Sequence, residues 1–138
     1  MAATDRVLVD SNVLIDVLTG DPAHFAWSSA RLAEIVDEGR AAINPVVFAE
    51  VSVGFPTMEA ADSALPRATF RRLDLPWKAA FLAGQAFVAY RRRGGARLAP
   101  LPDFYIGAHA LVAELPLLTR DPARFKTYFP ELALIAPG

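Results

Sequence analysis

The segment Val7-Leu8-Val9-Asp10-Ser11-Asn12-Val13-Leu14-Ile15 decides how this chain folds. Its first three residues form a continuous apolar run, which is typical of a short strand buried on both faces of a sheet. Ser11 or Asn12 is expected to cap the helix that follows. Because open α/β sheets bind ligands at the carboxyl ends of their strands, Asp10 is the first candidate site residue. The alternative is that Asp10 only caps the helix or solvates a turn.

Length and composition indicate one compact domain spanning residues 1–138. The chain has 138 residues, of which 54% are hydrophobic and 21% are charged, and this balance argues against disorder. It contains no cysteine, which excludes disulfides, thiolate metal sites and cysteine nucleophiles. The segment Met1–Arg6 lacks the features of a signal peptide, and no apolar run is long enough for a membrane span, so we expect a cytoplasmic protein. The net charge of −1 does not indicate a broadly basic surface for nucleic acid.

Helical and strand patterns alternate along the rest of the chain. Helices are expected over residues 26–38, 46–53, 57–65, 76–93 and 103–112, with a helical turn at 122–125, and short strands over 41–43, 70–75, 117–119 and 134–136. This order predicts an α/β fold with a mainly parallel central sheet and right-handed crossovers. The helix over 76–93 carries an apolar stripe that includes Phe81, Leu82 and Val88, which we interpret as core or dimer surface.

Four acids are placed to meet at one edge of this sheet. Asp10 and Asp121 each follow a short apolar strand, and the carboxyl ends of parallel strands share an edge. Glu50 lies on a nearly all-apolar helix and Asp103 begins another, so both can point into the same cleft. Each acid alone has an ordinary role as a cap or a solvent-facing residue, but four together repel one another unless cations neutralise them. Oxygen ligands without cysteine or a histidine set favour Mg²⁺ or Mn²⁺, whose natural reaction here is phosphodiester hydrolysis.

Four segments, in this order, resemble PIN-domain ribonucleases, and above all the VapC-type toxins of bacterial toxin–antitoxin pairs. The segments are VDSNVLID (9–16), NPVVFAEV (44–51), LPDFYIGAHA (101–110) and LLTRDPARF (117–125), and the resemblance covers essentially the whole chain. It implies a three-layer α/β/α fold and RNA endonuclease activity that depends on Mg²⁺ or Mn²⁺. It also implies a homodimer and inhibition by a cognate antitoxin.

Carried over by position, the resemblance implies a set of site residues. The metal-site acids are Asp10, Glu50, Asp103 and Asp121, and the polar residues that support them are Asn12 and Thr119. Water activated by metal held mainly by Asp10 and Asp103 would attack an RNA phosphate in line. The other two acids would complete the ligand set directly or through waters.

Basic residues near the end of the helix over 76–93 are candidates for contact with RNA or with the antitoxin. Three of them also complement the helix dipole, which is an ordinary structural role. The candidates are Arg91, Arg92, Arg93, Arg97 and, next to the last acid, Arg120. His109 stands alone in the middle of a buried helix, and we interpret it as a packed core residue.

Two other functions fit parts of the pattern. A phosphatase could use Asp10 as a covalent nucleophile, but haloacid-dehalogenase-like enzymes usually have a second aspartate where this chain has Asn12. A non-enzymatic α/β binding module would use the acids only to cap helices and to pair with arginines. A phospho-accepting receiver-like domain fits less well, because no lysine stands at the expected late strand.

Overall fold

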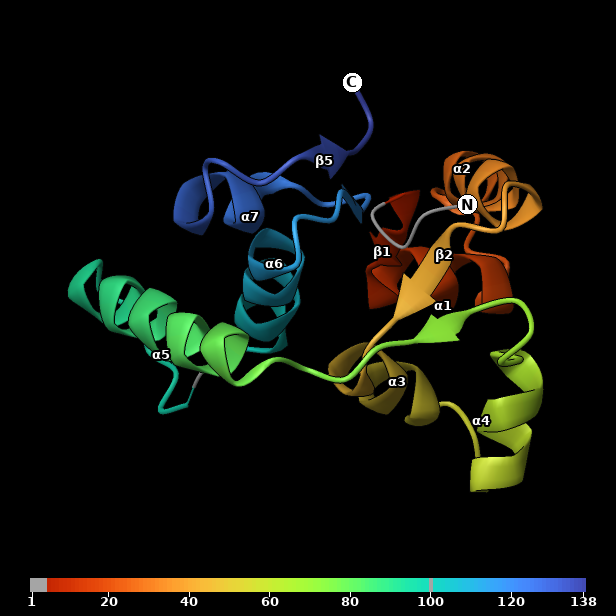
Figure 1. Cartoon of the computed structure of the whole chain (residues 1–138), viewed down its shortest axis with the longest axis horizontal. Coiled ribbons are helices and arrows are strands. Elements are labelled where there is room, and N and C mark those ends of the chain that lie inside the picture. The colour runs from red at the N-terminus through yellow and green to blue at the C-terminus, as the bar shows by residue number, and fades with distance from the viewer. Residues whose placement is uncertain (1–4, 100) are drawn as a thin grey trace.

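Within residues 5–99 and 101–138, which the computed structural model describes, the chain forms seven helices and a five-stranded sheet (Figure 1). The strands are β1 (Val7–Val9), β2 (Ala41–Ile43), β3 (Arg71–Arg72), β4 (Leu117–Leu118) and β5 (Leu134–Ile135). The helices are α1 (Ser11–Thr19), α2 (Phe25–Asp37), α3 (Pro45–Ser52), α4 (Met58–Ala64), α5 (Trp77–Arg92), α6 (Pro102–Val112) and α7 (Ala123–Tyr128). Met1–Thr4, part of the segment expected not to be a signal peptide, lies outside the described residues.

All five strands are parallel, in the order β3-β2-β1-β4-β5. From β1 the chain builds outward through β2 to β3, and then crosses back to add β4 and β5 on the other side of β1. The direction of winding therefore reverses between β1 and β4, and parallel sheets bind ligands at such a switch point. The three residues of β1 are 0% exposed, which explains their continuous apolar pattern.

Helices cover both faces of the sheet. α1 packs against α2 and α3, whereas α6 packs against α5 and α7. Figure 1 shows α5, α6 and α7 together on the left, and α1, α2 and α4 on the right. Right-handed crossovers require this division, because the chain adds strands in opposite directions on the two sides of β1. The result is the three-layer α/β/α architecture that the sequence predicts.

The start of α1 differs from the expectation. Asp10 occupies the N-cap position, and no side chain caps the helix. The Ser11 hydroxyl instead donates to Glu50 (2.7 Å), and the Asn12 amide donates to Thr119 (3.2 Å). The prediction that Ser11 or Asn12 caps this helix was therefore wrong, because tertiary partners engage both side chains.

The apolar stripe expected on α5 divides between two faces of the helix. Ala79, Ala83 and Ala86 face the core, whereas Phe81 is 64% exposed and Val88 is 40% exposed. The core part of the interpretation was therefore wrong for Phe81 and Val88, which lie on the solvent side. Among the described residues, α5 and the other helices are all too short or too polar to cross a membrane.

Gly107 in α6 permits two aromatic rings to approach the helix that carries Asp103. A Cβ atom on Gly107 would lie 2.6 Å from Phe129 Cδ2 and 3.0 Å from Phe125 Cδ1, and both rings are buried. We expect Gly107→Ala to destabilise the protein by roughly 1–3 kcal/mol, because these packed rings would have to move. Urea denaturation measures the change.

Gly84 in α5 provides the matched control, because a Cβ atom there meets nothing within 4 Å. Gly84→Ala should stabilise the helix by up to about 1 kcal/mol through propensity alone. Equal stability changes in the two variants would contradict the packing argument.

Candidate functional site

Side chains from four distant segments gather at the switch point of the sheet. Asp10 directly follows β1, and Thr119 directly follows β4, with Asp121 two residues further on. Asp103 lies in the first turn of α6, and Glu50 lies in the second half of α3. The contact between α3 and α6 brings these two helices together, although they follow different strands.

Asp10 is the most deeply buried of the predicted acids, at 2% exposure. Its Oδ2 accepts a hydrogen bond from the Thr119 hydroxyl at 2.8 Å, and its Oδ1 lies 3.5 Å from the Ser11 hydroxyl. Burial and the nearby charges of Asp103 and Glu50 raise the pKa of Asp10 to about 7, against the opposing effect of the Thr119 bond. No lysine, arginine or histidine forms an ion pair with Asp10 within the described residues.

Thr119 joins the carboxyl ends of β1 and β4. While its hydroxyl donates to Asp10, its oxygen accepts from the Asn12 amide (3.2 Å) and from the Asp121 backbone N–H (3.2 Å). Asn12 Oδ1 in turn lies 3.4 Å from the Arg120 backbone nitrogen, which donates to it. These bonds hold the loop after β4 against α1 and leave the Asp10 carboxyl in one orientation. Thr119 thus contacts Asp10 directly, whereas Asn12 is linked to Asp10 only through Thr119.

Glu50 turns toward Asp10 and not toward open solvent. Its Oε1 accepts the Ser11 hydroxyl at 2.7 Å, and the residue is half-buried. Burial and the charge of Asp103 raise the pKa of Glu50, and the Ser11 bond partly offsets this rise. Glu50, like Asp10, forms no ion pair within residues 5–99 and 101–138.

Asp103 has a cationic neighbour. Its Oδ2 accepts from Arg124 Nη1 at 3.1 Å, on the exposed side of the site. Burial nevertheless raises the pKa of Asp103, with a further contribution from Asp121, against the lowering effect of Arg124. An open hollow of about 370 Å³ lies beside Asp103 and Asp121, and Tyr90, Tyr128 and Arg124 also line it. Asp121 is exposed, so it is the most accessible of the four acids.

The donor set at this edge fits a hard divalent cation. It consists of carboxylate oxygens, and one guanidinium beside Asp103 does not neutralise the charges of Asp10 and Glu50. Burial, together with repulsion from neighbouring carboxylates, raises the pKa values of both residues. Oxygen-rich acidic sites of this kind suit Mg²⁺ or Mn²⁺ better than Zn²⁺.

The tightest group of candidate metal ligands in the described part of the chain lies elsewhere. One oxygen or nitrogen each from Asp16, Asp21 and His24 lie within 4.8 Å of one another, and no three of the predicted acids come that close. Asp16 accepts from Ser28 and from Arg120, both at 2.7 Å, and Asp21 accepts the backbone N–H groups of Ala23 and His24 in the turn before α2. These partners give the tight group a structural role. The wider spacing of the predicted acids suits Mg²⁺, which usually retains several waters beside one or two carboxylates.

The arginines singled out in the sequence have different surroundings. Arg120 forms an ion pair with the buried Asp16, so it braces the loop after β4 against α1. Arg91 donates to the Arg97 carbonyl (2.7 Å), and Arg93 lies over the Tyr128 ring at 5.4 Å. Arg91, Arg92, Arg93 and Arg97 are all exposed, so the structure leaves their predicted contacts with RNA or antitoxin available.

Sequence reasoning missed two residues that touch the acids. The Ser11 hydroxyl donates to Glu50, and the position of Ser11 directly after Asp10 in the sequence could have indicated that it lies at the site. Arg124 lies in the first turn of α7, and no local signal in the sequence pairs it with Asp103. His109 is buried and hydrogen-bonded to Asn44 (3.0 Å), and burial lowers its pKa, as suits a core histidine.

Comparisons with known proteins agree with this geometry. The profile of the family described as PIN domain matches residues 7–129. A comparison with curated protein sequences finds no match.

Solved structures with the same fold include components of toxin–antitoxin complexes. One is VapBC2 from Rickettsia felis bound to promoter DNA, with a TM-score of 0.69 and 20% identity over 96% of this chain and 98% of that chain. Another is VapBC-1 from nontypeable Haemophilus influenzae, with a TM-score of 0.69 and 19% identity over 94% and 96% of the two chains. A toxin–antitoxin complex from Klebsiella pneumoniae gives a TM-score of 0.59 and 26% identity over 96% and 98%.

Proposed function

The chain belongs to the PIN domain family, and we propose that it is a VapC-type toxin, an endoribonuclease that depends on Mg²⁺ or Mn²⁺ and is inhibited by a cognate antitoxin. The observation that carries this proposal is the convergence of Asp10, Glu50 and Asp103 at the switch point, where burial and the charge of Asp103 raise the pKa values of Asp10 and Glu50. The fold shared with chains of VapBC complexes supports the antitoxin part.

In this proposal Asp10 and Asp103 hold the cation, and Glu50 and Asp121 complete the ligand set directly or through waters. The bound ion would supply an ionised water at neutral pH and stabilise negative charge growing on a phosphoryl group. Thr119 fixes one oxygen of Asp10 and leaves the other without a short hydrogen bond to a side chain. Ser11 fixes Glu50 in the same way. The chain's own residues therefore hold the carboxylates in place before any ligand binds.

Two alternatives fit these contacts less well. A haloacid-dehalogenase-like phosphatase usually has a second aspartate two residues after its nucleophile, but here that position is Asn12, whose amide donates to Thr119. A binding module in which arginines neutralise the acids matches Asp103 alone, because within the described residues Asp10 and Glu50 lack such partners. Both observations favour the nuclease.

The homodimer is also part of the proposal. Trp77 and Phe81 on α5 are 91% and 64% exposed, and Leu98 in the following loop is 88% exposed. Trp77 and Phe81 are four residues apart and so share one face of α5, and exposed large apolar side chains on one helix face are typical of a protein–protein contact. A second copy of this chain would cover them.

Incubation of the purified protein with total RNA tests the proposed activity. We expect endonucleolytic cleavage with Mn²⁺ or Mg²⁺ and none with EDTA, and mapping of the new RNA ends should reveal internal sites. Mn²⁺ should also raise the melting temperature, because a cation relieves the repulsion among the acids. Absence of both cleavage and stabilisation would favour the binding module, and a trapped aspartyl-phosphate would favour the phosphatase.

A further inference from the structure

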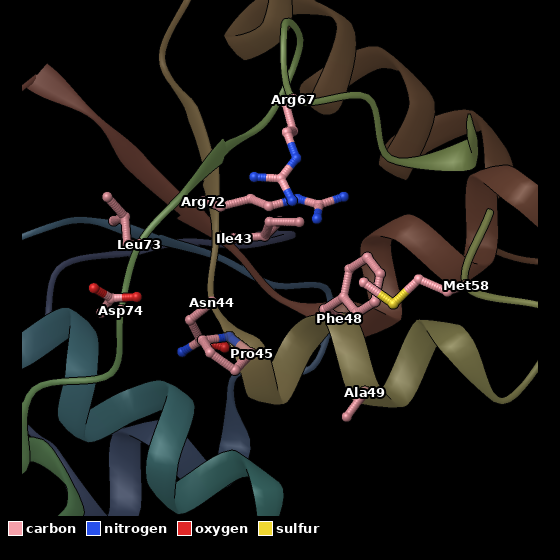
Figure 2. Close-up of a pocket in the computed structure, with 10 residues that line it drawn as sticks. All are labelled: Ile43, Asn44, Pro45, Phe48, Ala49, Met58, Arg67, Arg72, Leu73 and Asp74. Atoms are coloured by element: carbon pink, nitrogen blue, oxygen red, sulfur yellow. The ribbon is translucent and has the colours of Figure 1, made fainter. Parts of the chain in front are cut away.

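A second hollow, of about 340 Å³, lies on the other side of α3 from the acids (Figure 2). Phe48 and Ala49 on α3 line it, whereas Glu50 points toward Ser11. Successive helical residues are about 100° apart, so Phe48 and Glu50 leave the helix on nearly opposite sides. Ile43 and Leu73, at the carboxyl ends of β2 and β3, form its floor near the sheet.

Two arginines share one wall of this hollow. Figure 2 shows the side chains of Arg67 and Arg72 reaching toward one another. Arg72 pairs with Asp62 at 2.7 Å, but its Nε is buried without a hydrogen-bond partner among the described residues. Arg67 is exposed and makes no side-chain hydrogen bond or ion pair within the described ranges. Asp62 and the rim residue Asp74 balance the formal charge of the two arginines, but within the described residues neither forms an ion pair with Arg67, so its guanidinium group can bind an anion.

The remaining walls are apolar and partly flat. The Phe48 ring is half-buried, with Arg72 Cζ 4.7 Å from its centroid. Met58 lies beside this wall and is 63% exposed. Asp74 at the rim adds an acceptor for N–H groups. An aromatic ring, an arginine plane and a nearby acceptor are the features with which proteins bind an unstacked base of single-stranded RNA.

The topology places this hollow along the same edge as the acids. Asp10 follows β1, Asn44 follows β2 and Leu73 follows β3, and these strands are parallel neighbours. Adjacent strands lie roughly 4.8 Å apart, so the hollow is only about two strand spacings from β1. A single RNA strand that crosses the acids and continues along this edge reaches the hollow within a few nucleotides.

We propose that this hollow is a second RNA subsite, which binds a nucleotide of the substrate away from the scissile phosphate. Arg67 and Arg72 bind its backbone phosphate, and the wall formed by Phe48 and Met58 receives its base. This inference rests on the proposed nuclease function. The guanidinium group of Arg67, which has no ion-pair partner within the described residues, favours RNA over an apolar segment of a protein partner.

Paired substrates of different length test the subsite. One RNA oligonucleotide carries a mapped cleavage site with several nucleotides on each side, and the other is trimmed close to that site. For Arg67→Ala and Phe48→Leu we expect KM for the extended RNA to rise about tenfold, with kcat unchanged. Arg67→Ala should also reduce the salt slope of binding by about one. The trimmed RNA should be cleaved equally by these variants and the unmodified protein.

Arg71→Ala is the matched control. Arg71 is the neighbour of Arg72 on β3, and successive strand residues point to opposite faces. Like Arg67, it lines a neighbouring hollow with Gly39 and Thr69, and it is exposed, but it does not line the hollow beside Phe48. Arg71→Ala should behave like the unmodified protein with both RNAs, although it removes the same charge four residues further along the chain.

The outcomes separate this inference from the function on which it rests. If the unmodified protein cleaves RNA but both variants match it on the extended RNA, the hollow binds no RNA and a protein partner becomes its interpretation. If the variants raised KM equally for the extended and trimmed RNAs, the side chains would contribute only general attraction to RNA, and this result would also overturn the subsite. If no RNA is cleaved, the proposed function fails. Fluorescence anisotropy of a longer and a shorter single-stranded RNA of arbitrary sequence, in EDTA, then decides the subsite by itself, because only a subsite makes the loss of affinity in Arg67→Ala larger for the longer RNA.

Discussion

Asp10→Asn is expected to reduce metal-dependent RNA cleavage by roughly 10²- to 10³-fold while the protein remains folded. Asn preserves the shape of the side chain and can still accept the Thr119 hydroxyl, so the contact at 2.8 Å survives. It removes the negative charge at the centre of the acid group. Cleavage assays with Mn²⁺ measure the loss, and circular dichroism checks the fold.

Asp103→Asn should have a similar effect, because Asp103 is the acid whose charge contributes most to raising the pKa of Asp10. Asp37→Asn is the matched control, since Asp37 is an exposed residue at the end of α2 with no ion pair among the described residues. It should retain normal activity. Full activity in both Asp10→Asn and Asp103→Asn would remove the proposed mechanism.

The stability of the metal-free protein should fall as the pH rises from about 4 to about 7. The pKa of Asp10 is raised from 3.8 to about 7 in the folded state. Between these values the folded protein binds a proton that the unfolded chain has released, so raising the pH favours unfolding. At about 1.4 kcal/mol for each pKa unit, ionised Asp10 costs the fold on the order of 4 kcal/mol above pH 7. The raised pKa values of Glu50 and Asp103 act in the same direction.

Urea unfolding in EDTA at several pH values measures this dependence. Asp10→Asn provides the comparison, because it lacks the titrating carboxyl group. Its free energy of unfolding should therefore decline much less between about pH 4 and 7 than that of the unmodified protein. Adding Mn²⁺ at pH 8 should restore stability to the unmodified protein more than to Asp10→Asn. A decline of equal size in both proteins would show that other groups cause it.

Local sequence patterns were sufficient to predict the order of helices and strands. A strand buried on both faces must be apolar throughout, and the segment Val7–Val9 shows that pattern. The pair Asn44-Pro45 predicts a helix start, and Asn44 does accept the Val47 N–H at 2.9 Å. Most boundaries shifted by a residue or two, because the end of a helix depends on weak local preferences. The strand expected over 70–75 spans only Arg71–Arg72, and the helical turn expected at 122–125 extends to Tyr128.

The positions of the acids relative to predicted strands and helices selected the four candidates, and the resemblance to a known family assigned their roles. Asp16 illustrates this, since it follows Asp10 by six residues and is equally buried at 2%. Its partners are Ser28 and Arg120, so its role is structural. The local difference is that Asp10 ends a predicted strand, whereas Asp16 lies within the helix that follows.

The sequence by itself determined the α/β architecture, the lack of cysteine chemistry and the places where acids end strands or begin helices. The tertiary structure alone decided which side chains meet: Ser11 with Glu50, Thr119 with Asp10 and Asn12, and Arg124 with Asp103. The physical reason is that apolar periodicity is a local property that records which face of an element is buried. A hydrogen bond or an ion pair between segments far apart in the chain depends on how the strands and helices assemble. Each segment contributes only the donor or only the acceptor, so neither segment alone reveals the contact.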